Sequence, residues 1–246
     1  MMPDPKLAAI ILAGGRGKRM NSDHPKVLHV VGGRPMIHWV IDTAKSVGAD
    51  PLVVVVGRGR RHVKESLKDT GVMFATQHKP LGTAHAVEQT RSILASYKGC
   101  ILVLSGDVPG ISPGTIKGLC RRHGQTKARA TMLTAEVDKP TGYGRVLRDS
   151  EGHLLRVVEE KDATDEERTI REINGGIYVF DSQALFDTLP LVQNNNKQNE
   201  FYLPDILYIL REQNQIVAIE KASNYKEILG VNTKEELRKV HAEVFE

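Results

Sequence analysis

Short apolar runs alternate along the chain with amphipathic stretches of helix length. An unbroken apolar run is typical of a strand covered on both faces, and residues 53–56 are four valines in succession. Such runs occupy residues 7–12, 52–56, 101–104, 130–133 and 176–180, and helix-length stretches occupy 36–47, 59–68, 84–94 and 112–123. Strands that alternate with helices predict βαβ units. We therefore expect an α/β fold with a mainly parallel mixed sheet flanked by helices.

The second half of the chain has a less regular pattern. Residues 145–148 and 154–158 flank a Ser-Glu-Gly turn, which predicts a β-hairpin. The spacing Thr-x-x-Glu, typical of a capping box, occurs at Thr164 and at Thr233 and predicts that a helix starts at each. We expect the hairpin to form an insertion that lies over the sheet.

Few features divide the chain into separate parts. The polar run at residues 193–199 predicts a loop, and residues 203–213 predict a helix with Pro204 in its first turn. No internal repeat is present, and no linker rich in Pro, Gly or Ser. We expect residues 1–246 to form a single domain.

Composition is that of a soluble globular protein. Of the 246 residues, 40% are hydrophobic and 26% are charged. No apolar run approaches the roughly 20 residues of a membrane helix, and the run at 7–13 is too short for a signal peptide. Cys100 and Cys120 form neither a C-x-x-C pair nor a disulfide framework, which indicates a reducing compartment. We expect a cytoplasmic protein with no membrane partner, either a monomer or a small homo-oligomer.

The net charge of +4 is compatible with an anionic small substrate and with nucleic acid alike. Two basic clusters, at residues 58–62 and 121–123, could contact RNA, but neither contains an aromatic residue on which a base could stack. Solvated helix ends explain both clusters better, so we expect no nucleic-acid partner. The nine histidines have no zinc-ligand spacing.

A glycine-rich loop follows the first predicted strand, over residues 13–20. Its sequence, A-G-G-R-G-K-R-M, lets backbone N–H groups approach an anion closely. It lacks the Ser or Thr that a P-loop has after its Gly-Lys pair, and the third glycine of the dinucleotide-binding fingerprint. The glycines alone would fit a tight turn among solvated basic residues. Together with Arg19 and the following Pro25-Lys26, they favour a phosphate site.

Polar residues follow other predicted strands. Asp107 comes after residues 101–104, at the edge where α/β folds bind ligands, and it is either a Mg²⁺ ligand or a turn aspartate. Gln77 carries the acceptor and donors that a pyrimidine edge needs, although it could equally lie in a polar loop with Thr83 as a helix cap. Asn232 precedes a predicted helix and is either a capping residue or a ligand.

Seven further motifs, in order after the glycine-rich loop, resemble those of the sugar-nucleotide pyrophosphorylases. The sequence is similar, more narrowly, to the uridyltransferase half of the bifunctional N-acetylglucosamine-1-phosphate uridyltransferases/glucosamine-1-phosphate acetyltransferases. The resemblance runs from Leu7 to about Leu237. It is carried by P-K-V-L-H at 25–29, L-G-T-A-H-A at 81–86, G-D-V-P at 106–109, T-G-Y-G-R at 141–145, E-x-K-D-A at 159–163, E-I-N at 172–174 and G-V-N at 230–232.

The resemblance implies a Rossmann-like nucleotidyltransferase fold whose hairpin-bearing insertion binds a sugar. It implies transfer of a nucleotidyl group from UTP to N-acetylglucosamine 1-phosphate with Mg²⁺, for the synthesis of a cell wall precursor. The implied roles are catalysis for Arg19 and Lys26, nucleotide binding for Leu12, Ala13, Gly14, Gly15, Gln77, Gly82 and Thr83, sugar binding for Gly144, Glu159, Lys161 and Asn174, and metal binding for Asp107 and Asn232.

Alternatives to this function stay open. The chain could use dTTP or CTP instead of UTP, or it could be a non-catalytic subunit that binds a sugar nucleotide, although the full set of implied site residues argues against the latter. Two positions depart from the family pattern, Lys18 where members often have Thr, and Ser105 where they often have Tyr. No hexapeptide repeats of the acetyltransferase half occur, so we expect only the nucleotidyl transfer.

Overall fold

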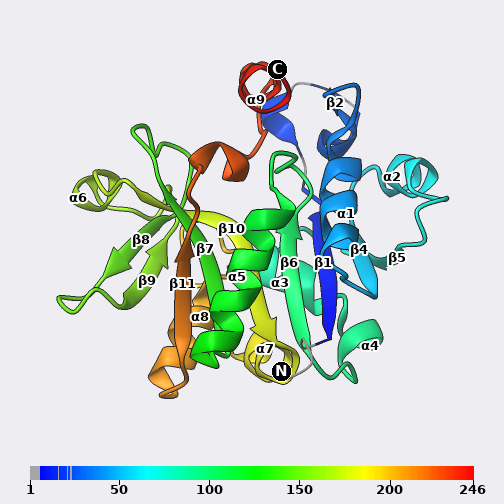
Figure 1. Cartoon of the computed structure of the whole chain (residues 1–246). Helices are drawn as coiled ribbons and strands as arrows, with labels where there is room; N and C mark the ends of the chain where they lie inside the picture. The colour runs from blue at the N-terminus through cyan, green and yellow to red at the C-terminus, as the bar shows by residue number, and fades with distance from the viewer. Residues whose placement is uncertain (1–5, 16, 21, 23) are drawn as a thin grey trace.

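The computed structural model describes residues 6–15, 17–20, 22 and 24–246. Strands in these residues form one large sheet (Figure 1). Its members are β1 (Leu7–Ala13), β4 (Leu52–Val56), β5 (Met73–Thr76), β6 (Cys100–Ser105), β7 (Ala130–Glu136), β8 (Arg145–Arg148), β9 (Leu154–Val158), β10 (Glu172–Asp181) and β11 (Val217–Lys221). The main order is β11-β7-β10-β6-β1-β4-β5, and β8 and β9 branch from β10. A two-stranded ribbon, β2 (Val30–Val31) and β3 (Arg34–Pro35), lies apart from this sheet.

Four parallel strands form the first half of the sheet. β1 pairs with β4 on one side and β6 on the other, and β4 pairs with β5. The carboxyl ends of these strands therefore lie at one edge, where the glycine-rich loop also begins. This is the edge at which open α/β sheets bind ligands. The mainly parallel α/β fold expected from the sequence is confirmed.

The other half of the sheet is mixed. β10 runs antiparallel to both β6 and β7, while β11 pairs parallel to β7 at the outer edge. The pairing of β10 with β7 is irregular between Asn174 and Tyr178, where Gly176 has a φ of +68° that L-residues rarely adopt. Because β10 is reversed, its first residues lie at the same edge as the last residues of β6.

The predicted hairpin is confirmed as β8 and β9, which pair antiparallel with each other. Along the chain, the hairpin lies between β7 and β10. Ile173 of β10 pairs with Arg145 of β8, so the hairpin branches directly from the sheet. The helix α6 (Asp165–Arg168) follows the hairpin and begins with the predicted capping box of Thr164 and Glu167.

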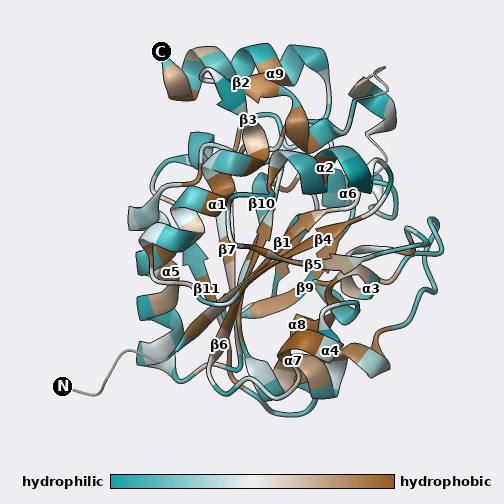
Figure 2. Ribbon diagram, turned by 90° about the vertical axis from the view of Figure 1, so that its right-hand side faces the viewer, coloured by the Kyte–Doolittle hydropathy of each residue, from teal (hydrophilic) through white to brown (hydrophobic). Residues whose placement is uncertain are grey.

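Helices cover both faces of the sheet, as the unbroken apolar strands predicted (Figure 2). In β1, Ala9 and Ile11 join the core on one face, and Ala8 and Ile10 join the core on the other. On the first face lie α1 (Met36–Ser46), α2 (Arg60–Ser66) and α5 (Pro113–Thr126), and on the second lie α3 (Thr83–Glu88), α4 (Arg91–Leu94), α7 (Ser182–Thr188) and α8 (Asp205–Glu212).

A smaller apolar cluster packs the end of the described chain against its beginning. Here α9 (Lys234–Val240) contributes Val240, which joins Met20, Met36 and Val231. The predicted capping box at Thr233 is confirmed, and a π-helical turn, His241–Phe245, follows α9.

Two helix predictions differ in detail from the structure. The expected helix over 84–94 is two helices, because the buried Thr90 hydroxyl donates to the Val87 carbonyl at 2.7 Å and interrupts the regular pattern. The expected helix over 203–213 begins only at Asp205, with Pro204 as its cap residue. In the part of the chain that is described, no helix is both long and apolar enough to cross a membrane.

Candidate active site

A cavity of about 750 Å³ opens at the carboxyl edge of the parallel strands. Its walls come from the glycine-rich loop, from the loops after β5 and β6, from the segment after β9 and from the segments before α8 and α9. Most of the expected site residues line it. They are Leu12, Ala13, Gly14, Gly15, Arg19, Lys26, Gln77, Gly82, Thr83, Asp107, Lys161 and Asn232.

Backbone contacts with neighbouring strands hold the glycine-rich loop. A β-carbon on Gly57, which follows β4, would lie 2.5 Å from the Gly14 carbonyl oxygen, so the two backbones approach more closely than side chains allow. On the other side, the Gly106 N–H donates to the Leu12 carbonyl at 2.9 Å. The loop is thus fixed from both sides by chain that follows the adjacent strands. The side chain of Lys18, one of the departures from the family pattern, lies outside the described part.

Gln77 lies directly after β5 and is 7% exposed. Its Nε2 is 3.0 Å from both the Gly82 carbonyl oxygen and His85 Nδ1. Burial lowers the pKa of His85, so a neutral ring with an acceptor nitrogen suits this contact. With both amide protons used inside the protein, the Gln77 oxygen faces Gly14 as a hydrogen-bond acceptor.

Thr83 does not cap the helix that it begins. The cap residue of α3 is Gly82, and the Thr83 hydroxyl oxygen instead accepts the Leu203 N–H at 2.9 Å. The capping alternative for Thr83 is therefore wrong. The contact fastens the loop after β5 to the segment that precedes α8.

Three residues far apart in the sequence meet at the wall of the cavity. Lys26, in the 3-10 helix Lys26–Leu28, forms an ion pair with Asp107, and its Nζ donates to Asn232 Oδ1 at 3.0 Å. The capping alternative for Asn232 is wrong, because Thr233 caps α9 and Asn232 lines the cavity. An acidic and an amide oxygen thus converge on one positive charge.

The side-chain oxygens of Asp107 and Asn232 fit a magnesium ion that takes most of its ligands from water and substrate. Both lie within reach of the same ammonium group, so one small cation could contact both. Among the described residues no group of three His, Cys, Asp or Glu side chains forms a metal site. A pair such as Asp107 and Asn232 is typical of Mg²⁺ that is also bound by water and substrate phosphates.

Gly144, Glu159 and Asn174 do not line the cavity but lie together beside it. A β-carbon on Gly144 would be 3.2 Å from Glu159 Oε1, and the Gly144 carbonyl accepts the Asn174 N–H at 2.9 Å. Asn174 Nδ2 donates to the Tyr178 hydroxyl at 2.7 Å. The structure therefore brings the three expected sugar residues into one group, held by β10 and the hairpin.

Glu159 has an unusual electrostatic environment. Burial, together with the carboxylates of Asp205, Asp162 and Glu200, raises the pKa of Glu159 to about 7, while Arg145 opposes the shift. Burial and the Asp162 carboxylate also raise the pKa of Asp205 to about 6. The group beside the cavity is therefore able to hold a proton near neutral pH.

The sequence did not indicate the part of the cavity formed by Gln198, Asn199 and Glu200. We expected only a polar loop at residues 193–199, and its asparagine-rich composition carries no signal of a ligand. The structure instead connects it to the expected site, since Lys161 Nζ donates to Gln198 Oε1 at 2.6 Å. Lys161 and Gln198 therefore close one side of the cavity together.

Comparison with known proteins identifies the class of protein that this fold and site define. The nucleotidyl transferase family model matches residues 8–230, so the chain belongs to the nucleotidyl transferase family and is a nucleotidyltransferase. Two relatives are bifunctional GlmU proteins, one from Staphylococcus saprophyticus that is 48% identical over 224 residues and one from Bacillus licheniformis that is 45% identical over 227 residues.

The alignments cover 91% and 92% of this chain, and 49% and 50% of the two relatives. The chain thus spans about half the length of the curated relatives it matches. A crystal structure of UDP-glucose pyrophosphorylase with UDP-glucose has a TM-score of 0.77 at 18% sequence identity, and the match covers 96% of this chain and 97% of that one. This likeness shows a shared nucleotidyltransferase fold.

Proposed function

We propose that the protein transfers a uridylyl (UMP) group from UTP to N-acetylglucosamine 1-phosphate and releases pyrophosphate. One observation carries the proposal. Lys26, Asp107 and Asn232 converge beside a glycine-rich loop at the edge where α/β folds bind nucleotides. The resemblance of the sequence motifs to the uridyltransferase half of bifunctional enzymes supports the choice of this nucleotide and sugar, and two relatives are bifunctional GlmU proteins.

The environment of Gln77 supports a uracil base. Its amide protons bind Gly82 and His85, which leaves the oxygen as the group available to the base. Uracil and thymine carry an N3–H donor that can bind this oxygen, whereas cytosine has an acceptor at N3. The arrangement therefore favours UTP or dTTP over CTP.

At the phosphates, the chain supplies positive charge and backbone donors. Arg19 and Lys26 neutralise the triphosphate and the charge that develops as pyrophosphate leaves, while the glycine-rich loop brings N–H groups close to the phosphates. The attacking phosphate monoester is mostly dianionic at neutral pH, because its second pKa is about 6. It needs no general base, so catalysis consists of alignment and charge neutralisation.

Asp107 and Asn232 would hold Mg²⁺. Bound there, the ion would neutralise charge on the reacting phosphates. The chain's own contribution is to present the two oxygens, and to keep Lys26 beside them so that its ammonium can contact phosphate oxygens. The sugar would lie against Gly144, Glu159 and Asn174, with Lys161 toward the phosphate.

We take residues 1–246 as one domain that acts in the cytoplasm, on small-molecule substrates and not on nucleic acid. Two cysteines are too few for a disulfide framework in a chain of this length, which supports a reducing compartment. A second candidate function is dTTP-dependent transfer, which the Gln77 environment also allows.

A pyrophosphate-release assay tests the proposal. The protein is mixed with Mg²⁺, each of the four ribonucleoside triphosphates or dTTP, and either N-acetylglucosamine 1-phosphate or glucose 1-phosphate. We expect the highest kcat/KM with UTP and the N-acetylated sugar. A preference for dTTP would favour dTTP-dependent transfer. Absence of turnover with every pair of nucleotide and sugar would indicate a non-catalytic binding subunit.

A further inference from the structure

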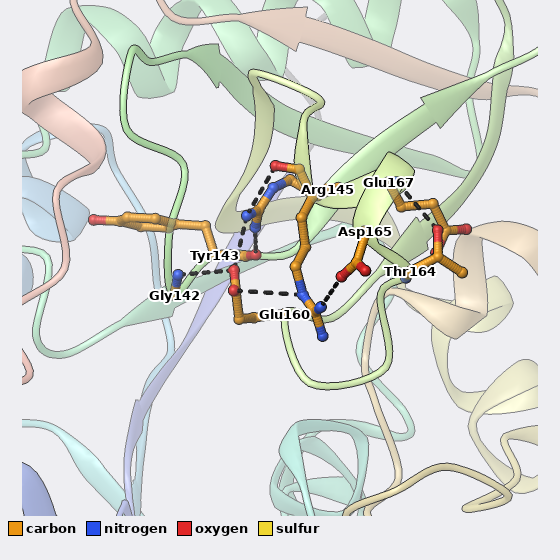
Figure 3. Close-up of polar contacts among 8 residues, drawn as sticks. Gly142, Tyr143, Arg145, Glu160, Thr164, Asp165 and Glu167 are labelled. Carbon is orange, nitrogen blue, oxygen red and sulfur yellow. Dashed lines mark hydrogen bonds and ion pairs between the residues drawn. The ribbon is translucent and has the colours of Figure 1, made fainter.

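An ion pair between a buried arginine and a partly exposed glutamate lies beside the proposed sugar contacts. Arg145, at the start of β8, is 1% exposed, and its Nη2 is 2.8 Å from Glu160 Oε2 (Figure 3). Each partner adjoins a proposed sugar residue along the chain, because Arg145 follows Gly144 and Glu160 follows Glu159. The pair therefore joins the two segments that carry these sugar residues.

The two side chains also hold the turn before β8. Arg145 Nη1 donates to the Tyr143 carbonyl, and Glu160 Oε2 accepts the Gly142 N–H at 3.0 Å (Figure 3). Arg145 Nη2 also donates to the Arg168 carbonyl at 3.5 Å, and a planar guanidinium can make these contacts at once, which a lysine cannot. The turn that contains Gly144 is thereby fixed against the segment that contains Glu159.

This turn also contacts two other parts of the site. The Tyr143 hydroxyl accepts the Gly230 N–H at 3.3 Å, two residues before Asn232. The Gly144 carbonyl accepts the Asn174 N–H at 2.9 Å. The turn is therefore linked directly to the sugar group, whereas Asn232 is held in addition by Lys26 and by Glu236.

Stability alone does not explain a charged pair at this position. Apolar side chains of similar volume often stabilise a core as well as a buried ion pair does. In addition, Nε of Arg145 is buried without a hydrogen-bond partner within the described part of the chain, which is unfavourable. The pair fits a role in geometry better than one in stability.

We infer that Arg145 and Glu160 are positioning residues that set the spacing of Gly144 and Glu159, and thereby the affinity for the sugar 1-phosphate. The inference rests on the proposed function. Breaking the pair lets the two segments separate, which weakens sugar binding. The nucleotide end, held by Gly57 and Gln77, keeps its geometry.

Steady-state kinetics tests this role of the ion pair. Three variants are compared with the unmodified protein: Arg145→Lys, Glu160→Gln and the double variant Arg145→Met with Glu160→Met. The KM for the sugar 1-phosphate should rise about tenfold, the equivalent of one hydrogen bond, while the KM for UTP stays within about twofold. The double variant removes both charges of the pair, so it should fold and still have the high sugar KM. The matched control is Arg156→Gln, which breaks an Arg156–Glu167 pair of the same 2.8 Å length on the surface of the insertion and should change neither KM.

The unmodified protein is assayed first, and circular dichroism melts establish that each variant is folded. Lack of turnover by the unmodified protein refutes the proposed function, and the inference with it. If the unmodified protein is active, an unchanged sugar KM in a folded double variant overturns only the inference. A parallel rise in both KM values, or failure of all three variants to fold, overturns it as well.

Discussion

The nucleotide and sugar ends of the proposed site are held in different ways. At the nucleotide end, backbone segments after adjacent parallel strands touch, as where Gly57 meets Gly14. At the sugar end, a side-chain ion pair links two segments, because the buried Arg145 at the start of β8 pairs with Glu160, which follows β9. Backbone contact depends on the absence of side chains, whereas a buried charge depends on its partner and on pH. The first end should therefore respond to added volume and the second to a change of charge.

The largest expected effect lies between the two ends, at the proposed metal pair. Removing divalent cations with excess EDTA should reduce turnover to background, because two reacting phosphates then repel each other without Mg²⁺. Addition of Mg²⁺ beyond the chelator should restore the rate in the pyrophosphate-release assay. The thermal midpoint should stay the same, since neither end needs the ion to fold. Full turnover in EDTA would contradict the metal role of Asp107 and Asn232.

Removing one charge from the same place should have the next largest effect. Lys26→Ala and Asp107→Ala should each lower kcat by about 100- to 1,000-fold, the usual result of losing one electrostatic contact to a transition state. Both residues are at the surface of the cavity, so the variants should fold, as circular dichroism would establish. The control is Lys117→Ala, an exposed lysine on α5. A near-normal kcat in a folded variant would remove that residue from the mechanism.

A single added methyl group should separate the two ends. A β-carbon in Gly57→Ala would lie 2.5 Å from the Gly14 carbonyl oxygen, so the glycine-rich loop must move. We expect the KM for UTP to rise about tenfold and the KM for the sugar 1-phosphate to change little. Gly124→Ala is the control, because its new methyl group meets no atom within 4 Å. Equal changes in both KM values would mean that the two ends are not independent.

The smallest expected effect concerns the charge of Glu159. Its pKa in the folded state is about 7, against an ordinary value of 4.5, so folding favours the protonated form. Stability from this carboxyl is fully present below about pH 4.5 and is lost as the pH rises through about 7. Glu159→Gln should therefore raise the free energy of unfolding by on the order of 2 kcal/mol at about pH 8, and by much less at about pH 5.

Urea unfolding at the two pH values measures this difference. The control is Glu151→Gln in the same insertion, whose side chain is 77% exposed and should give no pH-dependent gain. An equal gain for Glu159→Gln at both pH values would mean that its charge is not the source.

Sequence predicted the nucleotide end in more detail than the sugar end, for a physical reason. The strand before the glycine-rich loop is buried on both faces, so its apolar pattern and the following glycines are local signals. The ion pair of Lys26 with Asp107 joins residues 81 positions apart, but each follows a recognisable motif. Motif order therefore indicated residues that the fold brings together.

The environment of Glu159 had no such local signal. Its pKa depends on Asp205 and Glu200, which come from the segment around a loop whose composition is merely polar. The Lys161–Gln198 contact likewise depends on how that loop packs against the insertion. The edge strand β11 was not predicted either, because Val217–Lys221 alternates apolar and polar residues only briefly. Packing between distant segments decides these features, and a linear pattern does not record it.

The reversed direction of β10 has a consequence for how this fold can diversify. The chain leaves β7 after Glu136 and enters β10 at Glu172, and these two residues are paired in the sheet. The segment between them, which includes the hairpin and α6, therefore leaves the sheet and returns to it at the same position. A segment of different length or sequence could therefore replace this one without moving β7 or β10, so the proposed sugar contacts can change while the glycine-rich loop stays in place.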